Sequence, residues 1–254
     1  MNPATPEVRR HRDADEVGRA AAEETVAVAR QAVEARGRFF VALSGGSTPR
    51  RLYELLAESP YRERIRWSEV EFFWSDERAV DPDHPASNFR RAREALLQKV
   101  GVPPERIHRV QAERADLDAA AREYQRELAR VFGVLEDGPP PRFDLVLLGM
   151  GADGHTASLF PRTLALREPL RWVVPSRAPV DPRDRLTFTL PLIDRARCVL
   201  FLVIGADKAA VLAEVLEGAR DPERLPSQGV DPTDGRLLWL VDEAAASRLR
   251  LGAA

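Results

Sequence analysis

The sequence contains few of the residues that build disulfide frameworks and metal centres. It has one cysteine and four histidines among its 254 residues. Cys198 lies inside an apolar run and cannot form an intrachain disulfide, so we interpret it as a small core residue. No two histidines stand at a metal-ligand spacing, and with a single cysteine the sequence indicates no zinc site. We therefore expect no bound metal.

Long hydrophobic runs and an excess of one charge are also absent. No apolar stretch approaches the roughly 18–20 residues needed to span a bilayer, and the polar N-terminal segment shows no signal-peptide core. The net charge is only −2, with arginines interspersed among acidic residues, so there is no basic footprint for nucleic acid. We expect a cytoplasmic protein, a monomer or small homo-oligomer, with neither a membrane nor a nucleic-acid partner.

The overall composition is that of a folded, soluble chain. Hydrophobic residues make up 44% and charged residues 31% of the sequence, which is typical of globular rather than disordered proteins. The length suits one large domain or two small ones. Because we find no fixed-period repeat, no low-complexity tract and no clear linker, we expect a single domain over residues 1–254.

Helix-like and strand-like segments alternate along the chain. Helical spacing of apolar residues predicts helices over 13–36, 49–57, 86–99, 116–132 and 208–216, with Gly37 ending the first. Short apolar runs predict strands over 38–43, 70–74, 143–148, 172–174, 186–190, 199–204 and 237–241, the last followed by a short helix. This alternation favours an α/β fold with a mostly parallel sheet and helices on both faces.

The most informative segment is the turn Gly149–Thr156, which directly follows the buried strand predicted over 143–148. Three glycines in six residues permit positive φ and a close approach of the backbone to a ligand. Turns at the C-terminal ends of parallel strands are where open α/β sheets place their chemistry. His155 is a candidate general base toward water, and Asp153 is placed to hold its other ring nitrogen. The alternative is a surface histidine in a glycine loop.

A second turn, formed by Ser44, Gly45, Gly46, Ser47 and Thr48, precedes a predicted helix. Backbone N–H groups, two hydroxyls and the helix N-terminus together favour a bound anion such as phosphate. The segment is neither a Walker motif nor a dinucleotide-binding fingerprint. An N-cap turn that uses Ser47 or Thr48 explains these residues equally well.

Two further positions carry charge at predicted strand ends. Asp76 could accept hydrogen bonds from sugar hydroxyls, and Arg78 could clamp an anion with its planar fork. Lys208 follows a strand–glycine turn and would point its ammonium toward the same sheet edge. Each of these features taken alone is more often a solvated loop or helix start, so the residues by themselves do not decide between the two interpretations.

Taken together, these segments resemble the signature blocks of the 6-phosphogluconolactonase family, within the superfamily that also holds the glucosamine-6-phosphate isomerases. The blocks occur in the family's order over nearly the whole chain: Leu43–Pro49, Trp74–Arg78, Ser87–Phe89, Gly149–Pro161, Arg185–Leu190, Gly205–Ala209 and Leu238–Asp242. The resemblance implies a modified Rossmann-like α/β fold and hydrolysis of 6-phospho-D-glucono-1,5-lactone to 6-phosphogluconate, in the oxidative pentose phosphate pathway. It also implies that no cofactor is required.

The same block separates the lactonases from the isomerases. The isomerases carry a glutamate that helps to open the sugar ring, and counting from His155 its place is taken here by Phe160. Phenylalanine cannot carry protons, so the isomerase interpretation loses a needed group. The isomerases' Asp-Glu-Tyr segment appears here as Asp76-Glu77-Arg78, and the added arginine suits an anionic substrate.

The resemblance and the residues combine into one mechanistic hypothesis. Amides over 45–48, with Lys208 and either Arg78 or Arg185, would anchor the 6-phosphate, while His155 and Asp153 activate water. A third possibility, a sugar-phosphate-sensing domain of a regulator, would require an attached DNA-binding helix-turn-helix. The dozen residues before the first predicted helix are too few for such a module.

Overall fold

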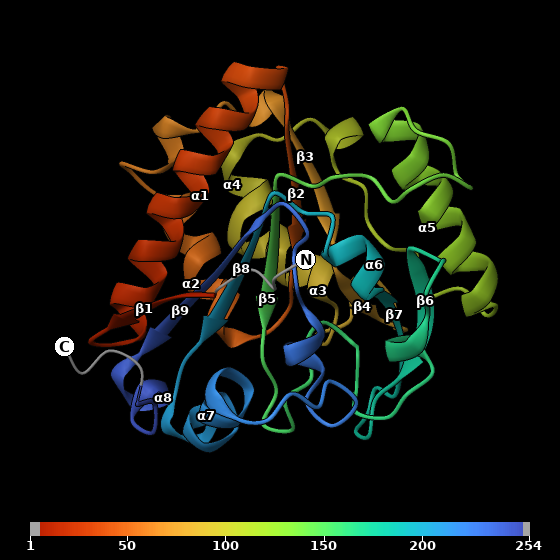
Figure 1. Ribbon diagram of the computed structural model, residues 1–254. Coiled ribbons are helices and arrows are strands. Elements are labelled where there is room, and N and C mark those ends of the chain that lie inside the picture. Colours follow the sequence, from red (N-terminus) through yellow and green to blue (C-terminus); the bar gives the residue numbers. More distant parts are fainter. Residues whose placement is uncertain (1–5, 251–254) are drawn as a thin grey trace.

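The structure is a computed structural model that describes residues 6–250 as two β-sheets surrounded by helices (Figure 1). The larger sheet has six strands in the order β1-β9-β8-β5-β2-β3. All its neighbouring strands pair in parallel. Its strands are β1 Glu7–His11, β2 Phe39–Leu43, β3 Val70–Trp74, β5 Leu145–Gly149, β8 Cys198–Val203 and β9 Arg236–Asp242. The predicted α/β fold with a mostly parallel sheet is confirmed.

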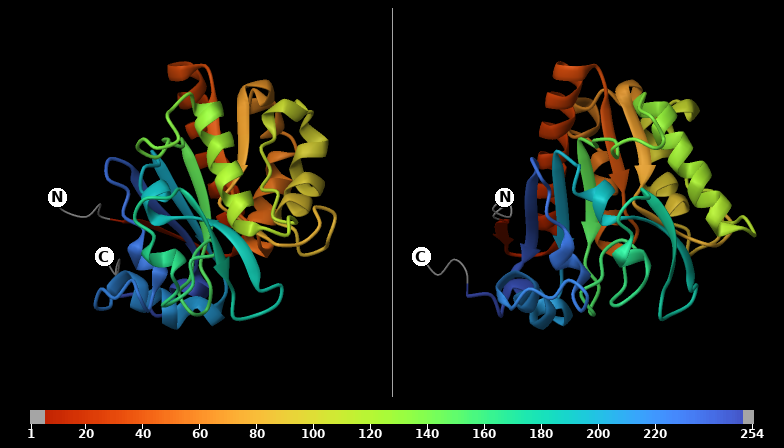
Figure 2. Two further views of the ribbon diagram at one scale, coloured as in Figure 1. Left: turned by 90° about the vertical axis from the view of Figure 1, so that its right-hand side faces the viewer. Right: turned by 45° about the vertical axis from the view of Figure 1, so that its right-hand side comes forward.

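Helices cover both faces of this sheet (Figure 2). They are α1 Ala14–Arg36, α2 Ser47–Leu56, α3 Asn88–Ala92, α4 Gln98–Val100, α5 Leu117–Phe132, α6 Leu190–Ile193, α7 Ala209–Glu217 and α8 Glu243–Ala246. Parallel strands are joined by right-handed crossovers, so connections running in opposite directions across the sheet put their helices on opposite faces. Accordingly α1 and α2 pack together on one face, whereas α5 and α7 belong to the other.

The ends of the long helices carry the capping chemistry that their sequences indicate. The Asp13 carboxylate accepts hydrogen bonds from two backbone N–H groups at the start of α1, and Gly37 ends that helix at φ 75°. The Asp116 carboxylate caps α5 by accepting from one backbone N–H group, that of Ala119, and Gly133 ends this helix at φ 68°. These residues satisfy backbone groups that a helix terminus leaves unpaired.

The core lies between the larger sheet and its helices. All six residues of β8 and all five of β3 are buried, as expected for strands covered on both faces. Cys198 is among them, and burial raises the pKa of its thiol to about 11. It is therefore an unreactive core residue, as predicted. No helix within residues 6–250 is both long and apolar enough to cross a membrane.

The edge strand β1 was not predicted from the sequence. It is short, largely exposed and charged, and among the strands of residues 6–250 it pairs with β9 alone. A charged edge strand carries no apolar alternation because one of its sides faces solvent, and charge protects such an edge from pairing with other chains. The signal used to predict strands is consequently missing from this segment.

The second sheet corrects two expectations. Its strands are β4 Asp76–Arg78, β6 Val173–Arg177 and β7 Asp184–Phe188, all antiparallel in the order β4-β7-β6. The segment 75–78 was interpreted as a turn, but Asp76–Arg78 pairs with β7 and becomes a strand. The predicted strands at 172–174 and 186–190 belong to this smaller sheet, with shifted bounds. In both cases pairing with a strand that is distant in sequence, rather than the local residue pattern, determines the secondary structure.

Helix boundaries differ from the prediction where the chain approaches the sheet edge. The helix α2 begins at Ser47, with Gly46 at the N-cap, so neither Ser47 nor Thr48 is the cap residue. The segment predicted as one helix over 86–99 is divided by a π-helical turn at Arg93–Leu97. A 3₁₀ turn at Ala206–Lys208 precedes α7. The other strands of the larger sheet lie within two residues of their predicted bounds, and the predicted short helix after β9 is α8.

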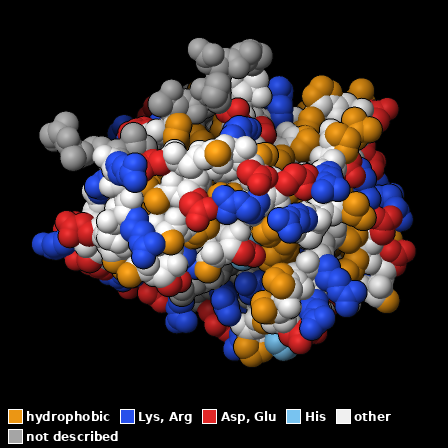
Figure 3. Space-filling model, turned by 60° about the horizontal axis from the view of Figure 1, so that its bottom comes forward, with side chains coloured by type: hydrophobic (Ala, Val, Ile, Leu, Met, Phe, Trp, Pro, Cys, Tyr) orange, Lys and Arg blue, Asp and Glu red, His pale blue; other side chains and the backbone are white. Residues whose placement is uncertain are grey.

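The parallel strands end along one edge of the larger sheet, at the bottom of Figure 1. The residues that follow β2, β3, β5 and β8 therefore gather there, and they include all three turns singled out in the sequence. Figure 3 shows this side, where acidic and basic side chains are interspersed rather than segregated. This edge is the carboxyl end at which open α/β sheets bind their ligands.

Candidate active site

A cavity of about 250 Å³ opens at this edge. Of the residues predicted to form the site, it is lined by Gly45, Gly46, Thr48, Asp76, Arg78, His155 and Lys208. Asp153 and Arg185 are not among its lining residues: Asp153 contacts His155, and Arg185 is buried. The backbone of Ser47 begins α2. Four loops that are distant in sequence thus meet at one cavity.

The glycine turn after β5 is shaped to carry a histidine. The Gly151 N–H donates to the His155 carbonyl at 2.9 Å, which closes the turn. Gly154 adopts φ 78°, a left-handed conformation that favours glycine. A Cβ at Gly151 would lie 2.1 Å from His155 Nδ1. The imidazole therefore folds back over the glycine, and a side chain at position 151 would displace it.

His155 and Asp153 form the pair predicted from the sequence. The Asp153 Oδ1 lies 2.5 Å from His155 Nδ1. Burial acts to raise the pKa of Asp153, but the hydrogen bond and charge of His155 outweigh it and the pKa is lowered. An ionised Asp153 accepts a hydrogen bond from the Nδ1–H group of a neutral His155, which leaves the lone pair on Nε2 available as a base.

The turn after β2 is held by a buried tyrosine. The Tyr53 hydroxyl, from α2, donates to the Ser44 carbonyl at 2.7 Å and accepts from the Ser44 N–H at 3.1 Å. Burial raises the pKa of Tyr53 well above its ordinary value, so the hydroxyl stays neutral and can make both bonds. These two hydrogen bonds hold the turn in place at the start of α2. The N–H groups in the first turn of α2, which have no acceptor within the helix, therefore lie beside the cavity.

Lys208 reaches the cavity from the loop after β8. Gly205, at φ 102°, directs the chain into the 3₁₀ turn that carries it. The Gly205 N–H donates to both carboxylate oxygens of Asp242, at 3.0 and 3.1 Å. Lys208 Nζ lies 3.3 Å from the exposed carboxylate of Asp207. Because the hydrogen bonds from Gly205 to Asp242 fix the turn, the Lys208 side chain is held at the cavity.

Asp76 forms the wall between these turns and is buried. Its Oδ2 accepts a hydrogen bond from the Ser158 hydroxyl at 2.7 Å. Its Oδ1 accepts from the Asn88 Nδ2 at 3.1 Å. In the sequence, Asn88 stands out only as part of the block Ser87–Phe89, and no local pattern indicates a role for Ser158. A strand-end aspartate is visible in a sequence, but the partners that orient it come from other elements and appear only in the fold.

Arg78 and Arg185 face each other across β4 and β7. Arg78 Nη1 donates to the Ala86 carbonyl at 2.6 Å, and its side chain lines the cavity. Burial and the charge of Arg78 lower the pKa of Arg185, whose Nε has no hydrogen-bond partner among the described residues. Arg78 lines the cavity, whereas Arg185 is buried and is not among the lining residues.

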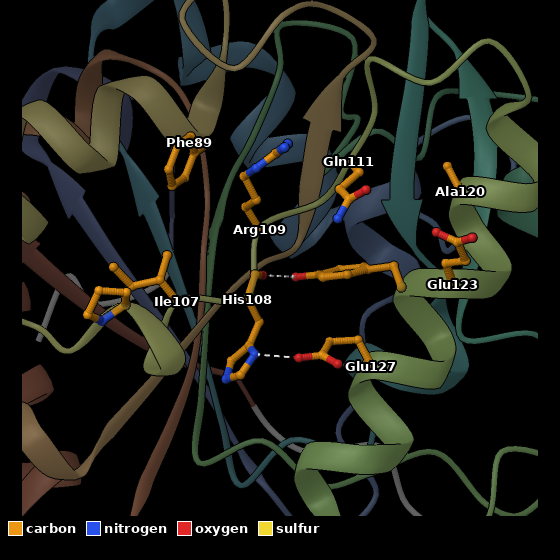
Figure 4. A pocket seen from close by; sticks show the side chains of 10 residues that line it. Phe89, Ile107, His108, Arg109, Gln111, Ala120, Glu123 and Glu127 are labelled. Atoms are coloured by element: carbon orange, nitrogen blue, oxygen red, sulfur yellow. Dashed lines mark hydrogen bonds and ion pairs between the residues drawn. The ribbon is translucent and has the colours of Figure 1, made fainter.

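A larger cavity of about 560 Å³ lies elsewhere, between α5 and the segment that joins α4 to α5 (Figure 4). His108 there contacts Glu127 at 2.8 Å through Nδ1 and Glu71 at 2.9 Å through Nε2. The hydrogen bonds of Arg130 and His108 outweigh burial and lower the pKa of Glu127. Because these groups satisfy one another, we assign this cavity no catalytic role. Within residues 6–250, no cluster of three or more His, Cys, Asp or Glu side chains could hold a metal ion.

Comparison with known proteins adds independent information. The profile of the family described as glucosamine-6-phosphate isomerases/6-phosphogluconolactonase matches residues 12–239. A 6-phosphogluconolactonase of Synechocystis sp. is 46% identical over 220 residues, which is 87% of this chain and 88% of that protein. The solved structure of 6-phosphogluconolactonase from Trypanosoma cruzi is 28% identical, covers 98% of this chain and 100% of its own, and superimposes with a TM-score of 0.85.

A monomeric glucosamine-6-phosphate deaminase also has this fold. Its structure superimposes with a TM-score of 0.79 over 95% of this chain and 99% of its own, at 23% identity. Such a likeness shows the fold alone. The architecture therefore supports more than one chemistry, and the residues of the site must separate them.

Proposed function

The chain belongs to the glucosamine-6-phosphate isomerase/6-phosphogluconolactonase family, and we propose that it hydrolyses 6-phospho-D-glucono-1,5-lactone to 6-phosphogluconate. One observation carries the proposal. His155, paired with Asp153, faces a cavity that also holds Lys208 and the N-terminus of α2. A general base thus stands beside two features that favour a phosphate.

His155 would activate the attacking water. With Nδ1 donating to Asp153, Nε2 removes a proton from water, and the hydroxide adds to the lactone carbonyl carbon. The C–O bond to the ring oxygen then breaks, and the imidazolium returns the proton to that oxygen. The new carboxylic acid ionises and releases one proton to solvent. Asp153 supports the imidazolium through its negative charge, which its lowered pKa maintains.

The phosphate would be held on the opposite side of the cavity. Backbone N–H groups of the turn over 45–48 and the ammonium of Lys208 are suited to a dianion. Binding energy from this remote group positions the carbonyl near His155. Asp76 would then accept hydrogen bonds from sugar hydroxyls. The side chain of Arg78 lines the cavity, and its guanidinium is suited to stabilise the oxyanion formed at the carbonyl.

Phe160 favours hydrolysis over isomerisation. Its ring lies 4.5 Å from the His155 ring, tilted by 42°, and its side chain is buried. It occupies the neighbourhood where the isomerases are expected to carry their ring-opening glutamate. An apolar ring there offers no proton acceptor, so His155 has no second acid–base group on this side.

The test is an assay with both substrates. Freshly generated 6-phosphogluconolactone is added to the purified chain in a pH-stat, and acid release is compared with uncatalysed hydrolysis. Glucosamine 6-phosphate is then added as a competing substrate and assayed for deamination. The proposal expects rapid acid release and no deamination. Deamination without lactone hydrolysis would reverse the assignment.

The site residues and the single-domain organisation over residues 1–254 belong to the same proposal. The family profile extends over 12–239, and the described part of the chain packs around one continuous hydrophobic cluster. Both observations support treating the chain as one catalytic unit.

A further inference from the structure

Asn88 has an unusual hydrogen-bonding environment. It is the first residue of α3 and is 1% exposed. Its Nδ2 donates to the Asp76 backbone carbonyl at 3.0 Å and to the Asp76 carboxylate at 3.1 Å. Its Oδ1 is buried and has no partner among the described residues. A buried carbonyl oxygen normally accepts a hydrogen bond, so its lack of one requires an explanation.

The unpaired oxygen lies against Gly45. A Cβ built on Gly45 would be 1.8 Å from Asn88 Oδ1 and 2.3 Å from Cγ, so the amide sits directly over the glycine Cα. Turning the amide around would place its oxygen against the two oxygens of Asp76 and lose both hydrogen bonds. The side chain is therefore fixed in this orientation, with its oxygen toward the turn.

The buried carboxyl group of Glu77 fixes the backbone around Asn88. Its Oε1 accepts from the backbone N–H groups of Arg78 at 2.7 Å and Asn88 at 2.8 Å. Its Oε2 accepts from the Phe89 N–H at 2.7 Å and from the Ser87 hydroxyl at 3.1 Å. Burial raises the pKa of Glu77, and the backbone donors oppose that rise. This carboxyl group fastens the start of α3 to β4 and leaves the Asn88 backbone little freedom.

We propose that Asn88 is a positioning residue of the catalytic site: its amide sets the spacing between the Gly45–Gly46 turn and Asp76. The turn contributes the phosphate-binding amides and Asp76 the sugar-binding carboxylate, so Asn88 links the two parts of substrate recognition. The inference rests on the proposed function, because it assigns a role within that site. Asn88 acts through its neighbours rather than on the reacting atoms.

The first test is a double-mutant cycle between the two residues in contact. Gly45→Ala should lower kcat/KM strongly in the wild-type background, because the methyl group collides with the Asn88 amide. In the Asn88→Ala background that collision is gone, so the same change should cost much less. Contacting residues depart from additivity by roughly 2- to 150-fold, and we expect at least tenfold. Additive effects would overturn the proposal.

Gly46→Ala is the matched control. Gly46 has φ 109°, and the nearest atom to its hypothetical Cβ is Pro49 Cδ at 3.7 Å. Alanine at position 46 is harmful because of backbone conformation, not because of Asn88. Its cost should therefore be the same with and without Asn88→Ala. If Asn88→Ala reduced the cost of Gly45→Ala and of Gly46→Ala equally, the cause would be a general loosening of the site. That result would contradict a specific contact between Asn88 and Gly45.

The second test uses the isosteric variant Asn88→Asp, which should fold because it keeps the size of the side chain. Two carboxyl groups within hydrogen-bonding distance cannot both ionise easily, so one retains its proton to higher pH. The charged or titratable groups around this position are Asp76, Glu77 and Arg78 of β4, Arg185 of β7, Arg91 of α3 and Arg50 of α2, together with His155 and Lys208, which line the same cavity. Among them Asp76 alone receives a hydrogen bond from the Asn88 side chain.

The readout is the ratio of kcat/KM in the variant to that in the wild type between pH 8 and pH 5.5. The ratio for Asn88→Asp should rise at least several-fold as pH falls, because a protonated acid again donates to Asp76. The ratio for Asn88→Ala should stay flat. A flat ratio for both variants, with unchanged thermal unfolding, would reduce Asn88 to a packing residue. If the wild type itself fails to hydrolyse the lactone, the proposed function fails, independently of this inference.

Discussion

At the scale of single residues, the account depends on how each side chain is oriented. Asp153 is half-buried and its pKa is lowered by His155 despite burial. It should therefore remain ionised throughout the pH range of an assay, and its protonation should add no limb to the wild-type pH profile above pH 5. The carboxylate fixes the imidazole and supports its charged form.

Replacing Asp153 with asparagine tests that role. Asp153→Asn keeps the shape but removes the negative charge that accompanies the imidazolium. We expect kcat to fall by roughly 10²–10⁴-fold, the usual contribution of a positioned acid–base group, with KM changed little. Steady-state kinetics with the lactone measures both. A variant with wild-type kcat would show that Asp153 does not support His155.

Lys208 is expected to act on binding rather than on chemistry. Lys208→Ala removes an ammonium from the cavity and should mainly raise KM, by roughly tenfold or more for one charge-assisted hydrogen bond. Lys99, the only other lysine of the sequence, is exposed on α4 and provides the matched control, since Lys99→Ala should leave KM unchanged. An unchanged KM in Lys208→Ala would remove this lysine from the phosphate site.

At the scale of elements, the turn after β5 is a folded unit rather than a flexible loop. The Thr156 hydroxyl donates to the Gly149 carbonyl at 2.9 Å, and the Ser227 N–H donates to the Gly154 carbonyl at 2.9 Å. The turn is thereby tied to itself and to the segment before β9. Its glycines are required for different reasons, and this difference can be tested.

Gly151→Ala should disable catalysis without unfolding the chain. The new Cβ would lie 2.1 Å from His155 Nδ1 and 2.6 Å from Asp153 Oδ1, so the pair must separate or move. We expect a loss of kcat similar to that of Asp153→Asn. Gly149→Ala, whose Cβ meets nothing within 4 Å, should cost far less. Thermal unfolding and kcat are measured for both variants, and equal losses would contradict the steric explanation.

The elements also show what the sequence can and cannot predict. The strand over 143–148 and its glycine turn were recognisable because an apolar run followed by glycines is a local pattern. The edge strand β1 and the short strand β4 were not, because each is charged and exists through pairing with a distant strand.

The same distinction applies to the site. His155, Asp76 and Lys208 were recognisable because each follows a predicted strand. Asn88 and Ser158 depend on contacts with Asp76 made across the fold, and no local pattern records such contacts. Arg185 is buried and is not among the residues that line the cavity, so its contact with the phosphate stays a prediction from its motif.

At the scale of the whole molecule, the buried acid Asp194 contributes to the dependence of stability on pH. Asp194 follows α6, and its Oδ1 accepts a hydrogen bond from the Asp231 N–H at 2.8 Å. Burial raises its pKa to about 7, from an ordinary value of 3.8. Between these values the folded chain binds the proton that the unfolded chain has lost. The free energy of unfolding should therefore decrease as pH rises from about 4 to 7.

Asp194→Asn mimics the protonated group and removes the contribution of Asp194 to this dependence. Denaturant unfolding at pH 5 and pH 8 should show a smaller decrease in stability for the variant than for the wild type. The difference in the free energy of unfolding between the variant and the wild type should therefore shift in favour of the variant between pH 5 and pH 8. An identical pH dependence in the two proteins would mean that Asp194 ionises normally in the folded state.

The central claim is that His155 is the base of a lactone-hydrolysing site, and one comparison tests it most directly. The turnover of 6-phosphogluconolactone is measured for the wild type and for His155→Ala, with uncatalysed hydrolysis subtracted and substrate binding followed separately. We predict that kcat falls by roughly 10²–10⁴-fold while binding is largely retained. Near-wild-type turnover by the folded variant would contradict the mechanism.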